Sequence, residues 1–350
     1  MAGGQGPPAR PYAPGWTDLA IGWVRARPYP RWLTYGVLIS FGILVSNAQT
    51  VLSGRPFEVT FTYTAWGVIT VGFLAALDAL NELAGDAFDR FQPALGEADV
   101  DPARARYELT TVPRNVALVV LLIAGPFTAY YYVEDPVASQ VSGLGPAALA
   151  GRWLFESFFT ALLLVLIVQA VRQLRLVSHL HAVATRIDLF HPAPLYAFSR
   201  LTALTGVALV GVIALGVALN PATLTANSFF LVWLPWLLVF PGVALLVFVG
   251  PLIGMHGRLV SLKSALQAAS ENRIKGVLAE LHRDVDGLDL GRADGLQKTL
   301  ASLLQERDIL ARLPTWPWST TTIRGFASAL LLPLVVFLLQ RLVGGALAVP

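Results

Sequence analysis

The chain has 350 residues, of which 55% are apolar and 13% are charged, with no cysteine and a net charge of +3. Its mean hydropathy is +0.62, and its charged fraction is about half that of soluble domains, which excludes an ordinary soluble fold. The lack of cysteine excludes disulfides and thiolate metal sites. Because the basic residues flank apolar runs instead of forming one stripe, no nucleic-acid partner is expected.

The first segment, residues 1–31, is rich in proline and is predicted to be a cytoplasmic tail. Apolar residues at helical spacing within 16–27 predict a short helix on the inner membrane surface. These residues are Trp16, Leu19, Ala20, Trp23 and Val24. The alternative interpretation is a loosely ordered tail.

Seven apolar runs follow, each long enough to cross about 30 Å of hydrocarbon. They lie near 32–50, 63–80, 115–133, 153–171, 201–219, 229–253 and 325–347. The predicted fold is therefore an all-α membrane protein with seven transmembrane helices. The first six occupy 32–253, with helical cytoplasmic loops at 81–114 and 172–200, and the seventh occupies 325–350.

The basic residues predict the orientation of these helices. Segments 1–31, 81–114, 172–200 and 254–324 hold 22 of the 25 Lys and Arg residues. Because Lys and Arg concentrate in cytoplasmic loops, the N-terminus is predicted inside and the C-terminus outside. We expect a multi-pass protein of the cell (inner or plasma) membrane, with most of its polar residues in one cytoplasmic helical layer.

The two loops between the earlier spans contain a helix start and a group of histidines. Asp101 followed by Pro102 predicts a helix N-cap with proline at the first helical position. His179, His181 and His191 lie close together in the sequence. The first two point to different sides of a helix, so packing is favoured over metal binding, and no metal or cofactor is predicted.

Segment 254–324 is predicted to be a helical hairpin below the membrane, closed by an elbow. Its two leucine-rich stripes are joined by a turn rich in Asp and Gly at 284–295. Other cytoplasmic helices or hairpins of neighbouring subunits could cover the stripes. The candidate oligomerisation residues are Leu259, Leu262, Leu266, Leu300 and Leu303.

The elbow, residues 313–319, returns the chain to the bilayer. Its Trp316 and Trp318 are predicted to be anchors at the membrane interface. Pro314 and Pro317 prevent a continuous helix, and Ser319 or Thr320 can cap the seventh span.

The seventh span contains the polar pair Gln340-Arg341 towards its outer end. One interpretation is a snorkelling arginine beside a hydrogen bond between helices. The other is a polar ring at the mouth of a pore. On the second interpretation, the candidate pore-lining or gating residues are Pro333, Phe337, Gln340 and Arg341.

No residue spacing typical of a hydrolase, a metalloprotease or a nucleotide-binding loop is present, so no enzymatic activity is expected. The ionisable residues Asp78 and Glu156 lie near the ends of the second and fourth spans. An ion-coupled transporter normally carries acidic residues nearer the midplane, so this class is disfavoured.

The topology and the seventh span together resemble the seven-transmembrane ion-channel superfamily of insect odorant and gustatory receptors. Five apolar residues, 335–339, precede Gln340, as in the middle of that family's seventh-helix signature. Pro333-Leu334 stands in place of Thr-Tyr, and Arg341 in place of Phe, which disfavours cation selectivity. The resemblance implies a tetramer with a cytoplasmic anchor domain and a pore lined by the seventh helix. The Thr-Trp-Pro-Trp elbow is also similar to that of uncharacterised bacterial polytopic proteins.

Three functional hypotheses follow from the sequence. The first is a homo-oligomeric channel or channel-like receptor, assembled through its cytoplasmic hairpins. The second is a membrane scaffold or signalling component that works through the cytoplasmic layer. The third is a small-molecule transporter or an intramembrane enzyme. The lipid bilayer and further copies of the chain are the expected partners, while the sequence predicts no particular ligand.

Overall fold

The computed structural model describes residues 10–134, 141, 143–219, 234–288, 291–332, 334–336 and 338–339, and every regular element within them is an α-helix. The helices are α1 (Trp16–Arg25), α2 (Arg31–Asn47), α3 (Gln49–Leu52), α4 (Phe61–Leu95), α5 (Pro102–Thr110), α6 (Arg114–Glu134), α7 (Pro146–Val183), α8 (Ala197–Leu219), α9 (Leu234–Asp286), α10 (Ala293–Arg312) and α11 (Thr320–Leu330).

Five helical segments of the described chain are long and apolar enough to cross a membrane. They are Arg31–Leu52, Phe61–Leu95, Arg114–Glu134, Pro146–Val183 and Gly242–Asp286. Two shorter apolar segments, Ala197–Gly211 and Thr320–Val336, lie where the fifth and seventh spans are predicted. The chain is thus a helical, membrane-embedded protein, while the count of seven spans and their direction stay predictions.

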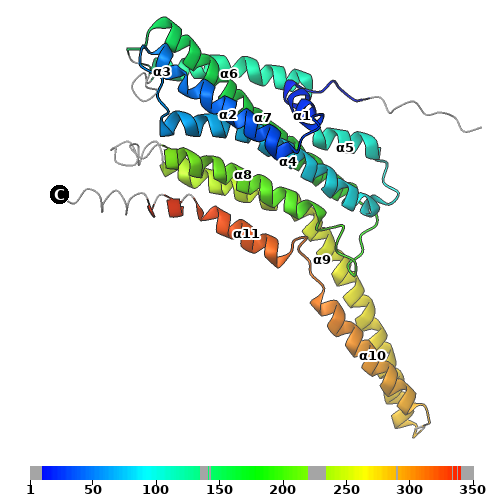
Figure 1. Cartoon of the computed structure of the whole chain (residues 1–350). Helices are drawn as coiled ribbons and strands as arrows, with labels where there is room; N and C mark the ends of the chain where they lie inside the picture. The colour runs from blue at the N-terminus through cyan, green and yellow to red at the C-terminus, as the bar shows by residue number, and fades with distance from the viewer. Residues whose placement is uncertain are drawn as a thin grey trace, which may run out of the picture.

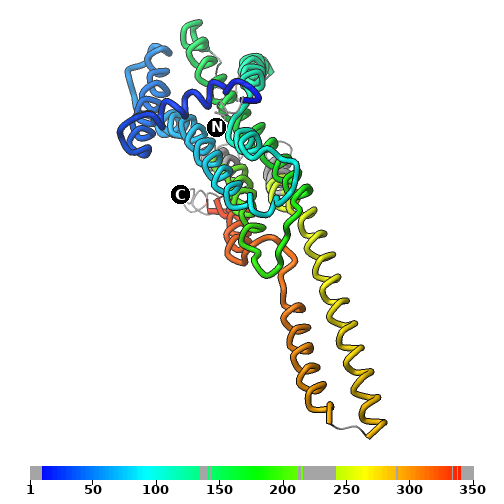
Figure 2. The backbone as a smooth tube through the Cα atoms, turned by 90° about the vertical axis from the view of Figure 1, so that its right-hand side faces the viewer, coloured from blue at the N-terminus to red at the C-terminus, as the bar shows by residue number. Residues whose placement is uncertain are grey.

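The helices form a bundle from which one hairpin projects (Figure 1). Helices α2, α4, α6, α7, α8 and α11 lie side by side, and the first half of α9 packs on α7 and α8. The second half of α9 leaves the bundle and pairs with α10. We call residues 264–312 the stalk, and Figure 2 shows it extending well beyond the bundle.

The main hydrophobic core lies where α4, α7, α8 and α9 meet. Phe91 and Phe198 are fully buried there with ring centroids 4.9 Å apart, and the His181 ring packs edge-on against both. Leu259 of α9 belongs to the same core and is only 2% exposed. This predicted oligomerisation residue therefore contacts helices of its own chain.

Two helix starts follow from local sequence. The Asp101 side chain accepts a hydrogen bond from the Ala103 N–H at the start of α5, with Pro102 at the first position. The Ser319 hydroxyl accepts from the Thr322 N–H at the start of α11. Both predicted caps are confirmed.

The N-terminal helix α1 lies against the bundle, within the range predicted for a short helix. It is packed through Thr17, Ile21 and Val24, which are buried. Leu19 and Trp23 lie on the opposite side and are 63% and 49% exposed. The apolar residues at helical spacing thus divide between a face that packs on the protein and a face that stays open.

Candidate functional site

The stretch of α9 that leaves the bundle, residues 254–263, is here called the junction. Its Arg258 guanidinium donates hydrogen bonds to the carbonyl oxygens of His181, Ala182 and Ala184 over 2.6, 3.1 and 2.5 Å. The last carbonyls of a helix lack partners within it and carry partial negative charge. Arg258 therefore fixes α9 to the C-terminal end of α7.

Two further basic residues of the junction bind carbonyls of the returning chain. The His256 ring nitrogen Nδ1 lies 2.8 Å from the Thr315 carbonyl oxygen, which can only accept, so Nδ1 carries the hydrogen. The Lys263 ammonium donates to the carbonyls of Ala311 and Leu313, at 2.7 and 2.8 Å. The junction thus also holds the end of α10 and the elbow.

A stack of aromatic rings links the elbow to α9 and α11. The His256 ring lies nearly parallel to Trp316, with centroids 3.7 Å apart. Trp316 stacks on Trp318 at 4.3 Å, and Trp318 stacks on Phe248 at 5.2 Å. Phe248 in turn contacts Phe326 of α11 at 4.3 Å. The two tryptophans therefore bind α9 within the chain, and their role as membrane anchors stays a prediction.

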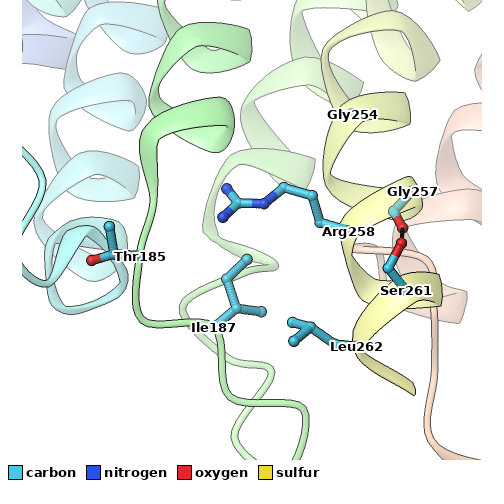
Figure 3. A pocket seen from close by; sticks show the side chains of 7 residues that line it. All are labelled: Thr185, Ile187, Gly254, Gly257, Arg258, Ser261 and Leu262. Carbon is cyan, nitrogen blue, oxygen red and sulfur yellow. Dashed lines mark hydrogen bonds between the residues drawn. The ribbon is translucent and has the colours of Figure 1, made fainter. Parts of the chain in front are cut away.

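A cavity of about 410 Å³ lies beside the junction. It is lined by Thr185, Ile187, Gly254, Gly257, Arg258, Ser261 and Leu262 (Figure 3). Its hydroxyls are already engaged, because Ser261 donates to the Gly257 carbonyl and Thr185 to the Leu95 carbonyl. This lining therefore offers no free nucleophile or acid–base group.

The stalk has a thin core of its own. Ser270, Ile274 and Leu310 are its buried side chains among the described residues. Two ion pairs, between Arg273 and Glu306 and between Arg292 and Glu280, have N–O distances of 3.5 and 3.8 Å. Exposed pairs of this kind contribute about 0–1 kcal/mol.

The leucines predicted to mediate oligomerisation are distributed unevenly over this hairpin. Leu262 and Leu266 of α9 are 38% and 39% exposed, and Leu304 of α10 is 36% exposed. Leu300 and Leu303 of α10 are half-buried. Apolar side chains of the stalk thus remain partly open on the surface of the single chain.

The residues predicted to line a pore, Pro333, Phe337, Gln340 and Arg341, lie outside the described part of the chain. Of the described residues between them, Leu334, Val335, Leu338 and Leu339 are 46–55% exposed and Val336 is half-buried. The pore hypothesis for the last span therefore stays a prediction.

A buried polar network lies near the predicted inner ends of the second and fourth spans. The amide nitrogens of Gln169 and Gln173 both donate to the Asn81 Oδ1 and to the Leu109 carbonyl, at 2.9–3.2 Å. These three side chains are 1–3% exposed. The network joins α4, the end of α5 and α7 through hydrogen bonds that lie away from water.

The carboxylate of Asp78 lies one helical turn from this network. It forms an ion pair with Arg25 of α1 and accepts a hydrogen bond from the Tyr35 hydroxyl at 2.9 Å. Asp78 is 3% exposed, and a buried charge of this kind requires a partner. The ion pair therefore docks α1 onto the bundle.

The sequence indicates Asp78 but neither the glutamines nor the junction. Gln169 and Gln173 are spaced by four residues at the end of an apolar run, a spacing that places them on one helix face. The basic residues of the junction were interpreted only as topology markers. These basic residues lie on one continuous helix, close to the places where the chain turns after α7 and after α10. This position is the feature that could have indicated a structural role.

The histidines of segment 172–200 are separated in the structure. His181 is buried with its Nδ1 at 3.2 Å from the Pro251 carbonyl, whereas His191 is exposed and paired with Asp188 at 3.0 Å. Among the described residues, no group of three or more His, Cys, Asp or Glu could hold a metal ion.

No family model matches the chain, and neither a curated protein nor a solved structure is significantly similar to it. The likeness to insect odorant and gustatory receptors stays a prediction. The functional interpretation therefore depends on the geometry of the junction, the stalk and the polar network.

Proposed function

We propose that this chain is the subunit of a homo-oligomeric, channel-like or receptor-like protein of the cell membrane. In this proposal seven spans cross the bilayer with the N-terminus inside. The cytoplasmic stalk joins the copies, and the last span faces the axis of the assembly. The proposal assigns no enzymatic activity and no cofactor to the chain.

The observation that carries the proposal is the attachment of both the stalk and the last helix to one short stretch of α9. Lys263 holds the end of α10, and His256 holds the elbow that leads into α11. Phe326 of α11 ends the ring stack that starts at His256. A displacement of the stalk would therefore be transmitted to the last helix, as a gating or signalling protein requires.

The surface of the stalk supports the oligomeric part of the proposal. A hairpin of two helices buries little apolar surface, and an apolar stripe of this kind needs a further partner. Leu266 and Leu304 are each more than a third exposed in the single chain. The stalk of a second copy would cover them and supply the missing core.

The oligomeric part is tested by the mass of the purified protein in nanodiscs. We expect more than one copy per disc for the wild type, and dissociation for the double variant Leu262→Ser/Leu266→Ser. Glu271→Ser, an exposed change on the same helix, is the control and should leave the mass unchanged. A wild type that is strictly monomeric and gives no conductance in liposomes would contradict the proposal.

A membrane scaffold or signalling component is the second candidate, favoured by the projection of the stalk beyond the bundle (Figure 2). Its working surface would be the stalk alone. Arg341→Ala separates the two candidates, because it should be harmless in a scaffold and should alter conductance in a channel. The Leu262→Ser/Leu266→Ser variant should impair both.

A further inference from the structure

A second cavity, of about 250 Å³, lies beneath α1 and has no part in the proposed assembly. It separates α1 from α4 and α5, next to the ion pair between Arg25 and Asp78. Its lining consists of Arg10, Pro14, Asp18, Ile21, Gly22, Arg25, Asn81, Tyr107, Thr110 and Thr111.

The orientation of the Asn81 amide in this cavity is fixed by a backbone group. Gln169 and Gln173 both direct their amide nitrogens at the Leu109 carbonyl, which can only accept. The same two nitrogens bind the Asn81 side chain, so Asn81 must accept through its oxygen. Its amide nitrogen is then left as a donor, and it makes no hydrogen bond to any described residue.

This donor opens onto the cavity, although the Asn81 residue as a whole is buried. Asn81 is 3% exposed, and buried amides normally satisfy their hydrogen bonds. An N–H left without a partner in a cavity costs free energy unless water or a ligand accepts from it. A water molecule or a ligand in the cavity would therefore accept a hydrogen bond from the Asn81 amide nitrogen.

The walls of the cavity add positive charge. Arg10 forms no ion pair with a described residue, whereas the guanidinium of Arg25 is already paired with the Asp78 carboxylate. Arg172 adjoins them by donating to the Thr111 carbonyl and the Tyr12 hydroxyl, and it has no carboxylate partner in the described chain. The unpaired positive charge near the amide donor thus comes from Arg10, which lines the cavity, and from Arg172, which lies next to the lining.

Asp18 is the carboxylate that opposes this charge. Its Oδ2 accepts hydrogen bonds from the backbone N–H groups of Gly15 and Val112, which turns this oxygen towards the loop before α6. Burial raises the pKa of Asp18 to about 6, so the group is still mostly ionised at pH 7 and offsets one of the two guanidinium charges. Asp18 weakens the positive character of the cavity without cancelling it.

We propose that the cavity beneath α1 binds a phosphate-type oxyanion, with Asn81 donating from the floor and Arg10 from the rim. Guanidinium and amide donors are the groups that recognise phosphate oxygens in proteins. Because α1 is predicted to lie at the inner membrane surface, the phosphate is either the headgroup of a lipid or a free anion of the cytoplasm. Both sources share the same recognition chemistry.

The first arm of the test titrates the full-length protein, in an uncharged detergent, with inorganic phosphate and follows its melting temperature. Chloride at equal ionic strength controls for screening. The second arm compares nanodiscs of phosphatidylcholine with discs that contain phosphatidylglycerol. A saturable rise with phosphate identifies the free anion, whereas a rise only with phosphatidylglycerol identifies the lipid headgroup.

Two variants link the effect to the cavity. Asn81→Asp keeps an oxygen for the glutamine amides and replaces the donor by a carboxylate, so it should abolish binding. Arg10→Gln lies at the rim, outside the packed core, and should weaken binding about tenfold or more, as expected for the loss of a charge-assisted hydrogen bond. Arg27→Gln is the control, because Arg27 stacks on Trp23 and does not line the cavity.

If Asn81→Asp fails to fold, the binding affinity of Arg10→Gln still tests the proposal. Equal affinity in the wild type and Arg10→Gln would overturn it. So would a rise that chloride reproduces, or the absence of any rise with both phosphate and phosphatidylglycerol.

Discussion

Asp18 joins two segments that are far apart in the sequence. Its Oδ2 accepts from Gly15 at 3.2 Å, inside α1's own N-terminal turn, and from Val112 at 2.9 Å, just before α6. The first bond caps α1 and the second ties it to the bundle. The Asp18 side chain therefore attaches the N-terminal helix to the bundle, and its ionisation affects the stability of this attachment.

Burial is the main cause that raises the pKa of Asp18, while its backbone hydrogen bonds and the nearby Arg172 and Arg25 lower it. The folded-state pKa of about 6 lies above the reference value of 3.8. The neutral carboxyl thus stabilises the folded state below about pH 4, and this contribution is lost as the pH rises through about 6.

We therefore expect Asp18→Asn to flatten the pH dependence of stability. The amide oxygen can still accept the two backbone bonds, but no charge develops on the buried group. Between about pH 5 and about pH 8, the melting temperature of the wild type should fall further than that of the variant. Asp99→Asn, an exposed change, should follow the wild type, and a parallel profile for Asp18→Asn would contradict the prediction.

The residues that the sequence identified correctly act over short distances along the chain. Asp101 and Ser319 cap the helices that begin directly after them, so a few neighbouring residues suffice to predict these caps. Arg258, His256 and Lys263 bind carbonyls that are 77, 59 and 48 residues away. Their partners depend on the packing of the whole bundle, which local patterns do not contain.

Helices α2 and α4 touch through their backbones at a pair of glycines. A Cβ atom placed on Gly67 would lie 2.6 Å from the carbonyl carbon and oxygen of Gly42. Backbone atoms cannot rotate away, so the helices would have to separate. Small residues that permit such close approach are a usual means of helix association in membranes.

Gly67→Ala should therefore destabilise the bundle by about 1–3 kcal/mol, the cost of overpacking a tight contact. Gly72→Ala in the same helix is the matched control, because its Cβ would meet nothing within 4 Å. The control should be neutral or slightly stabilising, since alanine favours a helix more than glycine does. Unfolding in mixed micelles measures both, and equal stabilities would refute the close contact.

The contact of α11 with α8 offers a similar test. A Cβ on Gly206 would lie 2.6 Å from the ring of Phe326, which is 4% exposed and has little room to move. Gly206→Ala should push α11 outward and speed hydrogen exchange of the amides in 320–330. Gly211→Ala meets nothing within 4 Å and should leave the exchange unchanged, whereas equal exchange in both variants would argue against the docking of α11.

At the level of elements, hydropathy predicts the long helices well, but it does not predict how a short helix packs. The five long apolar helices were all predicted as spans, because a run of about 20 uncharged residues has few other interpretations. The packing of α1 was not predictable in the same way. Its buried side includes Thr17 and its open side includes Trp23, an arrangement set by the partner surface instead of by residue type.

At the level of the whole molecule, the stalk and its attachment were only partly accessible from sequence. The leucine stripes and the Gly/Asp turn predicted two helical arms, and α9 and α10 pair as such arms. Which leucines remain open could not be inferred, because Leu259 has the same spacing as Leu262 and Leu266 yet lies in the core of the bundle. Burial depends on where along α9 the bundle ends.

Helix α9 runs without interruption through 53 residues, from Leu234 to Asp286, which corresponds to about 80 Å at 1.5 Å per residue. Arg258 binds the end of α7 near the middle of α9, so the two halves of α9 would tilt together about this point at the edge of the bundle. Beyond that point about 28 residues form an arm of roughly 40 Å. A tilt of about 5° within the bundle would then move the tip of the arm by roughly 3–4 Å, an amplitude that a neighbouring copy could detect.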